Sequence, residues 1–345
     1  MISGDPCALN LASSMYSRLL MMADSVDELN VFVPANDSKS NKVSLGARGV
    51  VRGFVGYKIN VAIAMIREGR EVDCDIVTAQ DPFWLGLVAL RISKRLGVPL
   101  HIQVHTDVFS PSYWSASFGN YVKFCIARCV LKRANCIRVV SERIAESMRV
   151  SGITAPISVL PIFIDIDAIV NAKTIDLKKE YPQFSQLILI AARLEKEKRV
   201  DSLFRVMHDV CKEIPQVGLF VAGDGSQHFE LEMLARTMGI ESHVVFLGRR
   251  QDIFSLYKSV DLVLAATATY EGYGASTVEA LCAGVPVVSE DVGVARDAGA
   301  IIATRDNFAK AAVRALQSNV AGLLKVKLPT CDEWVDQWKA GLCVL

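Results

Sequence analysis

The sequence predicts an α/β protein made of two doubly wound, Rossmann-like domains. Short apolar runs rich in β-branched residues alternate with longer segments of helical periodicity, which is typical of parallel sheets covered by helices. A chain of 345 residues is also too long for one ordinary core and suits two domains. A polar stretch near the middle of the chain interrupts the alternation. We therefore expect one domain on each side of this stretch, with a cleft between them.

The first half opens with a very short apolar run, Met1–Ser3, before Gly4-Asp5-Pro6. A doubly wound domain normally opens with a full strand, so either this strand is very short or the chain begins later than its relatives do. The β-branched runs that follow predict strands at Leu29–Pro34, Asp75–Thr78, Leu100–Val104, Cys136–Val140 and Ile157–Leu160. Helical periodicity between them predicts helices at Ser13–Ala23, Gly49–Glu68, Phe83–Leu96, Asn120–Arg133 and Glu142–Val150.

The second half repeats the alternation. Strands are expected at Gln186–Ala192, Val217–Ala222, His243–Leu247, Asp261–Ala265 and Val285–Ser289. Helices are expected at Val200–Glu213, Gln227–Met238, Gln251–Ser259, Ser276–Ala283 and Asn307–Ser318. Because the strand pattern stops over Phe163–Phe184, we place the domains at residues 1–165 and 166–330, followed by a C-terminal helix within 331–345 that packs back toward the N-terminal domain.

Composition narrows the function classes. No run approaches the roughly 20 apolar residues of a membrane span, and no basic segment followed by an apolar one marks a signal peptide at the start. The nine scattered cysteines form no CxxC pair, so we expect free buried thiols in a reducing cytoplasm. Residues 1–160 hold 18 basic and 13 acidic side chains. This excess suits an anionic acceptor or lipid surface, whereas no dense basic run indicates nucleic acid.

The strongest chemical signal lies between residues 270 and 288. A predicted strand runs into a loop that holds Glu271, and glycines that let a backbone approach a ligand follow it. A helix then begins near Ser276, and its first amides carry a partial positive charge that suits a diphosphate. Glu279 falls about one turn into this helix, where it can accept hydrogen bonds from sugar or ribose hydroxyls. The candidate binding residues of this run are Glu271, Gly272, Tyr273, Gly274, Ala275, Ser276 and Glu279.

A purely structural explanation of these residues stays open. Ser276 and Glu279 have the S-x-x-E spacing of a capping box, which would satisfy the first amides of the helix without any ligand. Glu271 would then be an ordinary solvated loop carboxylate.

Two further loops follow strands in the second half. Arg193 and Lys198 come after the strand ending at Ala192, and two cations at the carboxyl end of a strand can neutralise a leaving diphosphate. An exposed charged run leading into a helix is the alternative. The segment Gly223-Asp224-Gly225 follows the strand ending at Ala222, although a plain turn would also explain it. Three such loops on one domain would face the same cleft.

Together these residues resemble the retaining GT-B glycosyltransferases of family 4. The signature of that family is two glutamates separated by seven residues in an E-G-[FY]-G context, and Glu271 and Glu279 match it in full. The resemblance implies that Arg193 and Lys198 hold the donor diphosphate. It also implies that Glu271 contacts the transferred sugar and Glu279 the nucleotide ribose.

Other segments resemble family loops more loosely. The run Phe246–Gln251 is similar to the loop beside the nucleotide base, with Arg249 or Arg250 nearest. In the first domain, His105 follows a predicted strand and matches the family's histidine, which points at the donor sugar.

The acceptor side matches less well. Asp81-Pro82 also resembles a loop that lines the cleft. Many relatives have a glycine-rich P-x-x-G-G loop that receives the acceptor, and Ser3–Pro6 stands in its place here. The acceptor site is therefore not carried over.

The resemblance implies a hexosyl transfer with retained configuration and without a metal or other cofactor. The donor is a nucleotide sugar, with UDP-sugars favoured and GDP-mannose as the other candidate. The acceptor is a glycan, a lipid-linked molecule or a small molecule, as in polysaccharide biosynthesis. Two alternatives stay open: a non-catalytic or degenerate GT-B protein that binds sugar nucleotides, and a GT-B epimerase or phosphorylase.

We expect a cytoplasmic protein that contacts the inner face of the cell membrane peripherally. The predicted helix Gly49–Glu68 carries Arg52, Lys58 and Arg67 beside apolar residues, so it is the candidate contact surface. Ordinary packing of this helix onto the sheet is the alternative.

Overall fold

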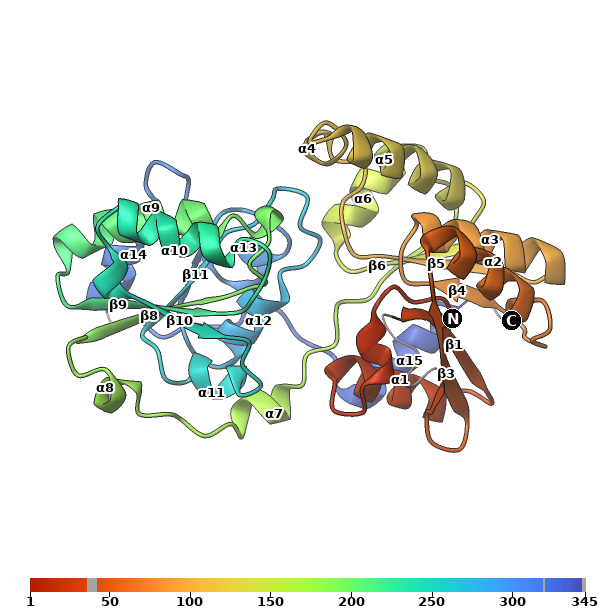
Figure 1. The fold of residues 1–345 in the computed structure, drawn as a ribbon, viewed down its shortest axis with the longest axis horizontal. Helices are drawn as coiled ribbons and strands as arrows, with labels where there is room; N and C mark the ends of the chain where they lie inside the picture. The colour runs from red at the N-terminus through yellow and green to blue at the C-terminus, as the bar shows by residue number, and fades with distance from the viewer. Residues whose placement is uncertain (36–41, 319, 343–345) are drawn as a thin grey trace. The chain divides into compact units, whose positions relative to one another are not determined.

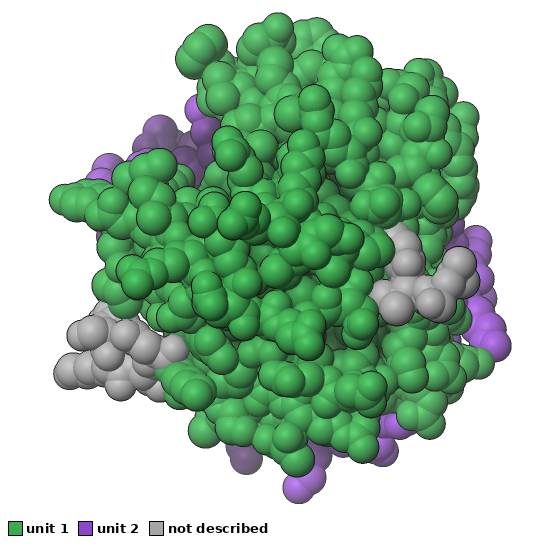
Figure 2. Space-filling model, turned by 90° about the vertical axis from the view of Figure 1, so that its right-hand side faces the viewer, with its two compact units in different colours: residues 1–161, 329–345 green, residues 162–328 purple. Residues whose placement is uncertain are grey.

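The computed structural model describes residues 1–35, 42–318 and 320–342. The chain forms two compact units (Figures 1 and 2). Unit 1 holds Met1–Pro161 and the segment from Pro329 onward, and unit 2 holds Ile162–Leu328. The chain thus leaves unit 1 at Pro161, builds the whole of unit 2, and then returns to unit 1.

The predicted strands and helices of unit 1 occur in the predicted order with one exception, and the unit also contains three short elements that were not predicted, at Pro6–Leu9, Lys42–Ser44 and Pro111–Trp114. Its strands are β1 (Leu29–Ala35), β2 (Lys42–Ser44), β3 (Gly49–Val55), β4 (Val77–Ala79), β5 (Leu100–Val104), β6 (Cys136–Val139) and β7 (Ile157–Val159). Its helices are the 3-10 helix η1 (Pro6–Leu9), α1 (Ser14–Asp24), α2 (Lys58–Gly69), α3 (Trp84–Leu96), α4 (Pro111–Trp114), α5 (Phe118–Leu131), α6 (Glu142–Val150) and α15 (Cys331–Ala340). The predictions for β5 and α6 are confirmed at both ends.

The exception is the single helix predicted over Gly49–Glu68, which is wrong. Its first part, Gly49–Val55, is the strand β3, which pairs in parallel with β1 along its whole length, and α2 begins only at Lys58. A Cβ added at Gly49 would lie 2.9 Å from the carbonyl oxygen of Leu29 on β1. The two backbones approach so closely that only glycine fits at position 49, which favours strand pairing over a helix here. No single helical face therefore spans the segment.

The sheet of unit 1 is mostly parallel and is centred on the first residues of the chain. Its strands follow the orders β2-β3-β1 and β4-β5-β6-β7. Ile2 lies between the two groups, because it pairs in parallel with Phe32 of β1 and with Ala79 of β4. The amide of Ile2 donates to the carbonyl oxygen of Thr78 (2.7 Å). Met1–Ser3 therefore acts as the short central strand that joins the two groups.

Helix α15 fixes the point at which the chain leaves unit 1. The side chains of Trp334 and Trp338 are buried in unit 1, each with 2% of its surface exposed. The indole nitrogen of Trp334 donates to the carbonyl oxygen of Pro161 (2.8 Å), and the guanidinium of Arg138 donates to the same oxygen (3.0 Å). Arg138 also lies over the Trp334 ring, 5.0 Å from its centroid. The segment that returns from unit 2 thus binds Pro161, the last residue of unit 1 before the chain enters unit 2.

Unit 2 repeats the same architecture. Its strands are β8 (Gln186–Ala191), β9 (Val217–Ala222), β10 (Val244–Gly248), β11 (Leu262–Ala265), β12 (Val287–Ser289) and β13 (Ile301–Ile302). Its helices are α7 (Ile166–Val170), α8 (Leu177–Glu180), α9 (Val200–Glu213), α10 (His228–Thr237), α11 (Ile253–Tyr257), α12 (Ala275–Cys282), α13 (Ala295–Ala298) and α14 (Phe308–Ser318), with 3-10 helices η2 (Lys196–Lys198) and η3 (Glu241–His243). The predictions for β9 and α9 are confirmed at both ends.

The order of the strands in unit 2 positions the candidate site. In the described residues the sheet is parallel throughout and runs β10-β9-β8-β11-β12-β13. The order reverses between β8 and β11, so the chain leaves these neighbouring strands toward opposite sides of the sheet. A crevice opens at such a reversal, outside the carboxyl ends of the two strands, and ligands of doubly wound sheets bind there.

The cysteines differ from expectation in two respects. Of the described cysteines, seven are free, and three of these (Cys125, Cys129 and Cys331) are exposed rather than buried. Cys136 is disulfide-bonded, so the expectation of free thiols throughout is wrong at that position.

None of the described helices is both long enough and apolar enough to cross a membrane.

Candidate active site

The loops that follow β8 and β11 meet at the reversal point of unit 2. Lys198, in η2 after β8, donates to the Glu271 carboxylate after β11 (Nζ to Oε2, 2.5 Å). The two side chains retain 24% and 19% of their surface exposed. The hydroxyl of Thr267 lies 3.1 Å from the same carboxylate oxygen and 3.2 Å from the carbonyl oxygen of Glu197. The structure therefore brings together two of the residues expected to bind the donor, although 73 positions separate them in the chain.

A pocket of about 270 Å³ opens beside this pair, within unit 2. Lys198 and Glu271 line it, and the ends of β8 and β11 form its floor. The first residues of α12, from Gly274 to Thr277, form another side. One cation, one carboxylate and a helix N-terminus thus face the same small space.

The N-terminus of α12 carries no side-chain cap. Its N-cap residue is Gly274, with a left-handed backbone (φ 84°), and no side chain bonds to the first amides. The capping box considered for Ser276 and Glu279 is therefore wrong, because the helix begins before Ser276. The positive end of the helix dipole is left to face the pocket, where it favours an anion.

Glu279 has a different partner in the structure. The buried hydroxyl of Tyr257 donates to its carboxylate (3.2 Å). Burial, reinforced by the negative charge of Glu279, raises the pKa of Tyr257 well above its usual value. The same two causes raise the pKa of Tyr273 to about 12. Both phenols therefore stay protonated, and Tyr257 holds the carboxylate from one side as a permanent donor.

The Gly223-Asp224-Gly225 loop supports the segment after β8 through its backbone. A Cβ at Gly223, whose φ is 152°, would lie 1.8 Å from the carbonyl oxygen of Ala192, and one at Gly225 would lie 2.4 Å from that of Leu194. The amide of Leu194 donates to the carbonyl oxygen of Asp224 (3.0 Å). Both glycines are therefore required for backbone contact with the loop that leads to Lys198.

Three predicted cations lie on the surface of unit 2. Arg193 follows β8 as expected, but 69% of its side chain is exposed and it pairs with Glu197 (3.2 Å). Arg250 forms two hydrogen bonds to Asp252 (2.7 and 2.6 Å), and Arg249 is exposed. Lys198 is therefore the predicted cation that the structure places on the pocket.

Sequence reasoning missed the residues that hold the Lys198 loop. Arg199 binds the Glu290 carboxylate through both guanidinium nitrogens (2.5 and 3.2 Å) and lies 3.4 Å from the carbonyl oxygen of Thr267. In the described chain it is the one residue other than glycine with a positive φ (48°). Such a backbone costs energy and persists only where the surroundings enforce it. The R-x-x-x-x-K-R run of the loop contained this signal, but its partner at residue 290 lies too far along the chain to be recognised.

In unit 1, His105 lies at the carboxyl end of β5, as predicted. Burial, with the charges of Arg138 and Arg18 nearby, lowers its pKa to about 3, so the imidazole is neutral at physiological pH. Asp81 follows the neighbouring strand β4 and lies beside Gly4, where a Cβ would be 3.7 Å from its Oδ2. The loops after three adjacent strands of unit 1 thus share one edge of its sheet, with burial raising the pKa of Asp81.

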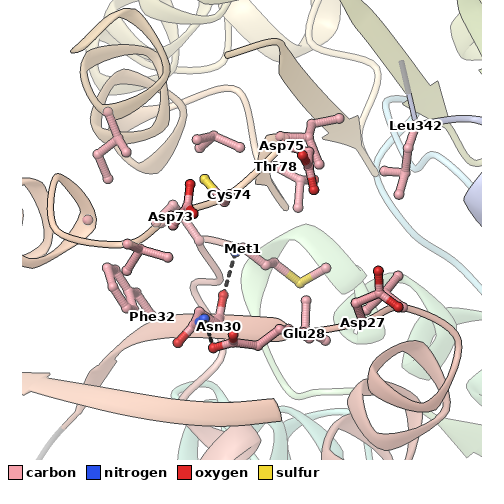
Figure 3. A pocket seen from close by; sticks show the side chains of 18 of the residues that line it. Met1, Asp27, Glu28, Asn30, Phe32, Asp73, Cys74, Asp75, Thr78 and Leu342 are labelled. Atoms are coloured by element: carbon pink, nitrogen blue, oxygen red, sulfur yellow. Dashed lines mark hydrogen bonds between the residues drawn. The ribbon is translucent and has the colours of Figure 1, made fainter. Parts of the chain in front are cut away.

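Another pocket, in unit 1, lies at the opposite edge of that sheet. It has a volume of about 500 Å³ and is lined by the residues that precede β1 and β4, including Asp27, Glu28, Asp73 and Asp75 (Figure 3). Ligands of parallel sheets bind at the carboxyl ends of the strands, and four carboxylates would repel a diphosphate. This pocket is therefore not the candidate site.

Comparisons with known proteins agree with this geometry. Residues 173–318 match the family described as glycosyl transferases group 1, and residues 27–168 match glycosyltransferase family 4. The chain is 25% identical over 245 residues to the alpha-monoglucosyldiacylglycerol synthase of Streptococcus pneumoniae. The aligned region covers 64% of this chain and 52% of that protein. It is 27% identical over 239 residues to the GDP-mannose-dependent alpha-mannosyltransferase of Mycobacterium tuberculosis, which covers 68% and 60%. The chain thus spans about half the length of these curated relatives.

A solved structure shows the same fold. The chain of Anabaena HepE in complex with UDP-glucose matches with a TM-score of 0.71 at 20% identity, over 99% of both chains. The two doubly wound units are therefore those of a GT-B glycosyltransferase fold, as the sequence predicted. Within that class, the two family matches and the relatives indicate a glycosyltransferase of the family 4 type.

Proposed function

We propose that this chain transfers a hexose from a nucleoside diphosphate sugar, with retention of configuration, and that the donor binds in the pocket of unit 2. The observation that carries the proposal is the Lys198–Glu271 pair (2.5 Å) beside the uncapped N-terminus of α12 at the strand reversal. A nucleotide sugar presents a diphosphate next to a ring of hydroxyls. A cation with free helix amides, next to a carboxylate, complements both parts.

The reaction breaks the bond between the anomeric carbon and the diphosphate and forms a bond from that carbon to an acceptor hydroxyl oxygen. The proton of this hydroxyl passes to the departing phosphate, on which negative charge grows until the proton arrives. Lys198 and the first amides of α12 are fixed donors that would stabilise this charge. Donors held in place before the reaction need no reorganisation as the charge develops, and in this proposal they perform the task without a metal. Arg193 lies on the same loop, and a change of its side-chain conformation away from Glu197 would add a second cation.

The sugar and the ribose are assigned to the two glutamates. In the proposal the Glu271 carboxylate accepts a hydrogen bond from a hydroxyl of the transferred sugar. This hydrogen bond replaces the one from Lys198, so the Lys198 ammonium becomes available to the phosphate. The Glu279 carboxylate accepts hydrogen bonds from the ribose hydroxyls while the Tyr257 hydroxyl, which donates to the same carboxylate, keeps it in position. His105 is neutral because its pKa is about 3, so in this proposal it orients the sugar as a hydrogen-bonding group and not as a cation.

The donor base and the acceptor are proposed from the relatives. HepE was solved with UDP-glucose, which favours a UDP-sugar, and the mycobacterial relative is named as GDP-mannose-dependent, which makes GDP-mannose the second candidate. The streptococcal relative is named as a synthase of a glucosylated diacylglycerol. A lipid-linked acceptor or a glycan is therefore the acceptor class that we propose.

Calorimetric titration with UDP, GDP and ADP in the presence of a chelator tests the proposal. We expect micromolar binding of UDP, and we expect Lys198→Ala and Glu279→Ala each to weaken it. The matched control is Lys178→Ala, because Lys178 pairs with Asp261 (3.1 Å) just before β11, at the other end of the strand. Binding of no nucleotide, or equal losses in all three variants, would refute the donor site.

A further inference from the structure

The turn between η2 and α9 is held by an ion pair that lies outside the donor pocket. Arg199 caps both elements and has a left-handed backbone (φ 48°, ψ 36°). Its guanidinium binds the Glu290 carboxylate through both terminal nitrogens (2.5 and 3.2 Å). The two side chains retain only 22% and 19% of their surface exposed. A planar fork of this kind fixes direction as well as distance, so the pair keeps a strained turn in one conformation.

The ion pair joins the loops of three neighbouring strands. Arg199 lies in the loop after β8 and Glu290 directly follows β12, while β11 lies between these two strands in the sheet. The Arg199 guanidinium also lies 3.4 Å from the carbonyl oxygen of Thr267, in the loop after β11. A pair that reaches across β11 therefore ties together the loops from which the residues of the pocket come.

The backbone that carries Lys198 is anchored on both sides. On one side, the carbonyl oxygen of Glu197 accepts hydrogen bonds from the amide of Ala268 (2.8 Å) and from the hydroxyl of Thr267 (3.2 Å). On the other side lies Arg199 with its ion pair. The residue before Lys198 and the residue after it are thus both bound to neighbouring loops, which gives a long and flexible side chain a defined starting point.

We propose that Arg199 is a positioning residue for the transfer, because it places the Lys198 ammonium against the donor diphosphate without touching the donor itself. This inference rests on the proposed function of the pocket. Lys198 lines the pocket, whereas neither Arg199 nor Glu290 is among the described residues that line it. Because Glu290 neutralises the guanidinium, the pair adds little net charge to the site and acts through its geometry.

Direct contact between Arg199 and the diphosphate is the alternative, and the variant Glu290→Gln separates the two. If Arg199 contacted the phosphates, loss of the carboxylate would release a cation and strengthen the binding of UDP. If Arg199 acts through the turn, loss of the fork should weaken UDP binding roughly tenfold. Arg199→Gly should weaken it in the same direction. Glycine adopts a left-handed backbone without strain, so this variant removes the ion pair and still permits the turn.

A double-mutant cycle with Lys198→Met shows whether the effect passes through Lys198. Calorimetry with UDP is applied to Lys198→Met, to Arg199→Gly and to the two combined. We expect Arg199→Gly to weaken binding roughly tenfold by itself and by less than about twofold once Lys198 is replaced, because residues that act through one contact are not additive. Losses that multiply in the double variant overturn the proposal, as does stronger binding of UDP by Glu290→Gln.

Arg296 supplies the matched control. It donates through two nitrogens to the carboxylate of Asp291 (3.1 and 2.9 Å), also in the loop after β12, but 62% of its side chain is exposed. Arg296→Gln should therefore bind UDP as the unchanged protein does, and a loss equal to that of Arg199→Gly would count against the proposal. Circular dichroism and urea unfolding check that every variant is folded. Unchanged UDP binding by Lys198→Met would refute the donor site itself, whereas an effect of Lys198→Met without one of Arg199→Gly would overturn this inference alone.

Discussion

The two ends of the Lys198–Glu271 bond have separate tasks in the proposed reaction, so they can be tested separately. Lys198→Met should weaken binding of UDP and of UDP-glucose alike, by about 10- to 100-fold, because it removes a charged hydrogen bond to phosphate. Glu271→Gln should spare UDP, which has no sugar, and weaken UDP-glucose by about tenfold. Calorimetry with both ligands measures the difference. Equal effects of Glu271→Gln on both ligands would contradict the assignment of Glu271 to the sugar.

Gly223 is the residue whose backbone supports the Lys198 loop most directly. Gly223→Ala should destabilise the protein by about 3 kcal/mol or more, because the added Cβ meets the Ala192 carbonyl oxygen at 1.8 Å and φ is 152°. Gly97→Ala is the matched control: its φ is also positive (74°), but no atom lies within 4 Å of the new Cβ, so only the backbone cost of about 1 kcal/mol remains. Urea unfolding measures both. Similar losses in the two variants would show that steric contact is not the cause.

At the scale of the element, α15 is expected to stabilise unit 1 although it is last in the chain. Trp334→Ala should cost about 3–5 kcal/mol, because it removes a buried ring, its stacking on Arg138 and its bond to Pro161. Trp334→Phe keeps a ring but loses the bond, and we expect it to cost about 1–2 kcal/mol. Urea unfolding followed by a signal from unit 1 gives these values. Unchanged stability in Trp334→Ala would mean that α15 is not part of the cooperative unit.

The elements that the sequence predicted well are those whose signal is local. The strand at Leu100–Val104 is an apolar run with clear limits, and the helix at Glu142–Val150 has a complete amphipathic period. Gly49–Val55 failed because its apolar residues suit either period, and its pairing with β1 decided the outcome. The start of α12 failed because a serine looked like a cap, while the actual cap is Gly274 with a left-handed backbone.

The site shows the same limit. Its loops could be found from the sequence because each follows a strand, and the glutamate spacing is local. That Lys198 touches Glu271, while Arg193 stays on the surface, depends on which strands are neighbours. The order of strands is a property of the whole sheet, and a pattern of single elements does not contain it. The pairing of Arg199 with Glu290, 91 positions apart, was missed for the same reason.

For the whole molecule, the buried His101 and the partly buried His105 of unit 1 predict acid sensitivity. Burial, with Arg138 nearby, lowers the pKa of His101 and of His105 to about 3, against about 6.5 in an unfolded chain. The unfolded state therefore binds more protons, and the stability is fully present above about pH 6.5 and is lost as the pH falls toward 3. At about pH 5 the loss for the deeply buried His101 is about 2 kcal/mol.

Thermal unfolding at about pH 7.5 and about pH 5 measures this effect. The double variant His101→Gln/His105→Gln carries no group that titrates at these positions, so its unfolding temperature should fall less between the two pH values. A fall as large as that of the unchanged protein would assign the acid sensitivity to other groups.

The interruption of unit 1 by unit 2 has a consequence for biosynthesis. The ribosome releases the chain in order, so all of Ile162–Leu328 emerges before the segment that contains Trp334. Unit 2 is continuous and can therefore finish folding while unit 1, begun earlier, still lacks α15. During that interval the carbonyl oxygen of Pro161 can accept the hydrogen bond from Arg138 but not yet the one from the indole of Trp334. The nascent unit 1 is thus the part of the chain that would most need a chaperone, and it is completed last although it is made first.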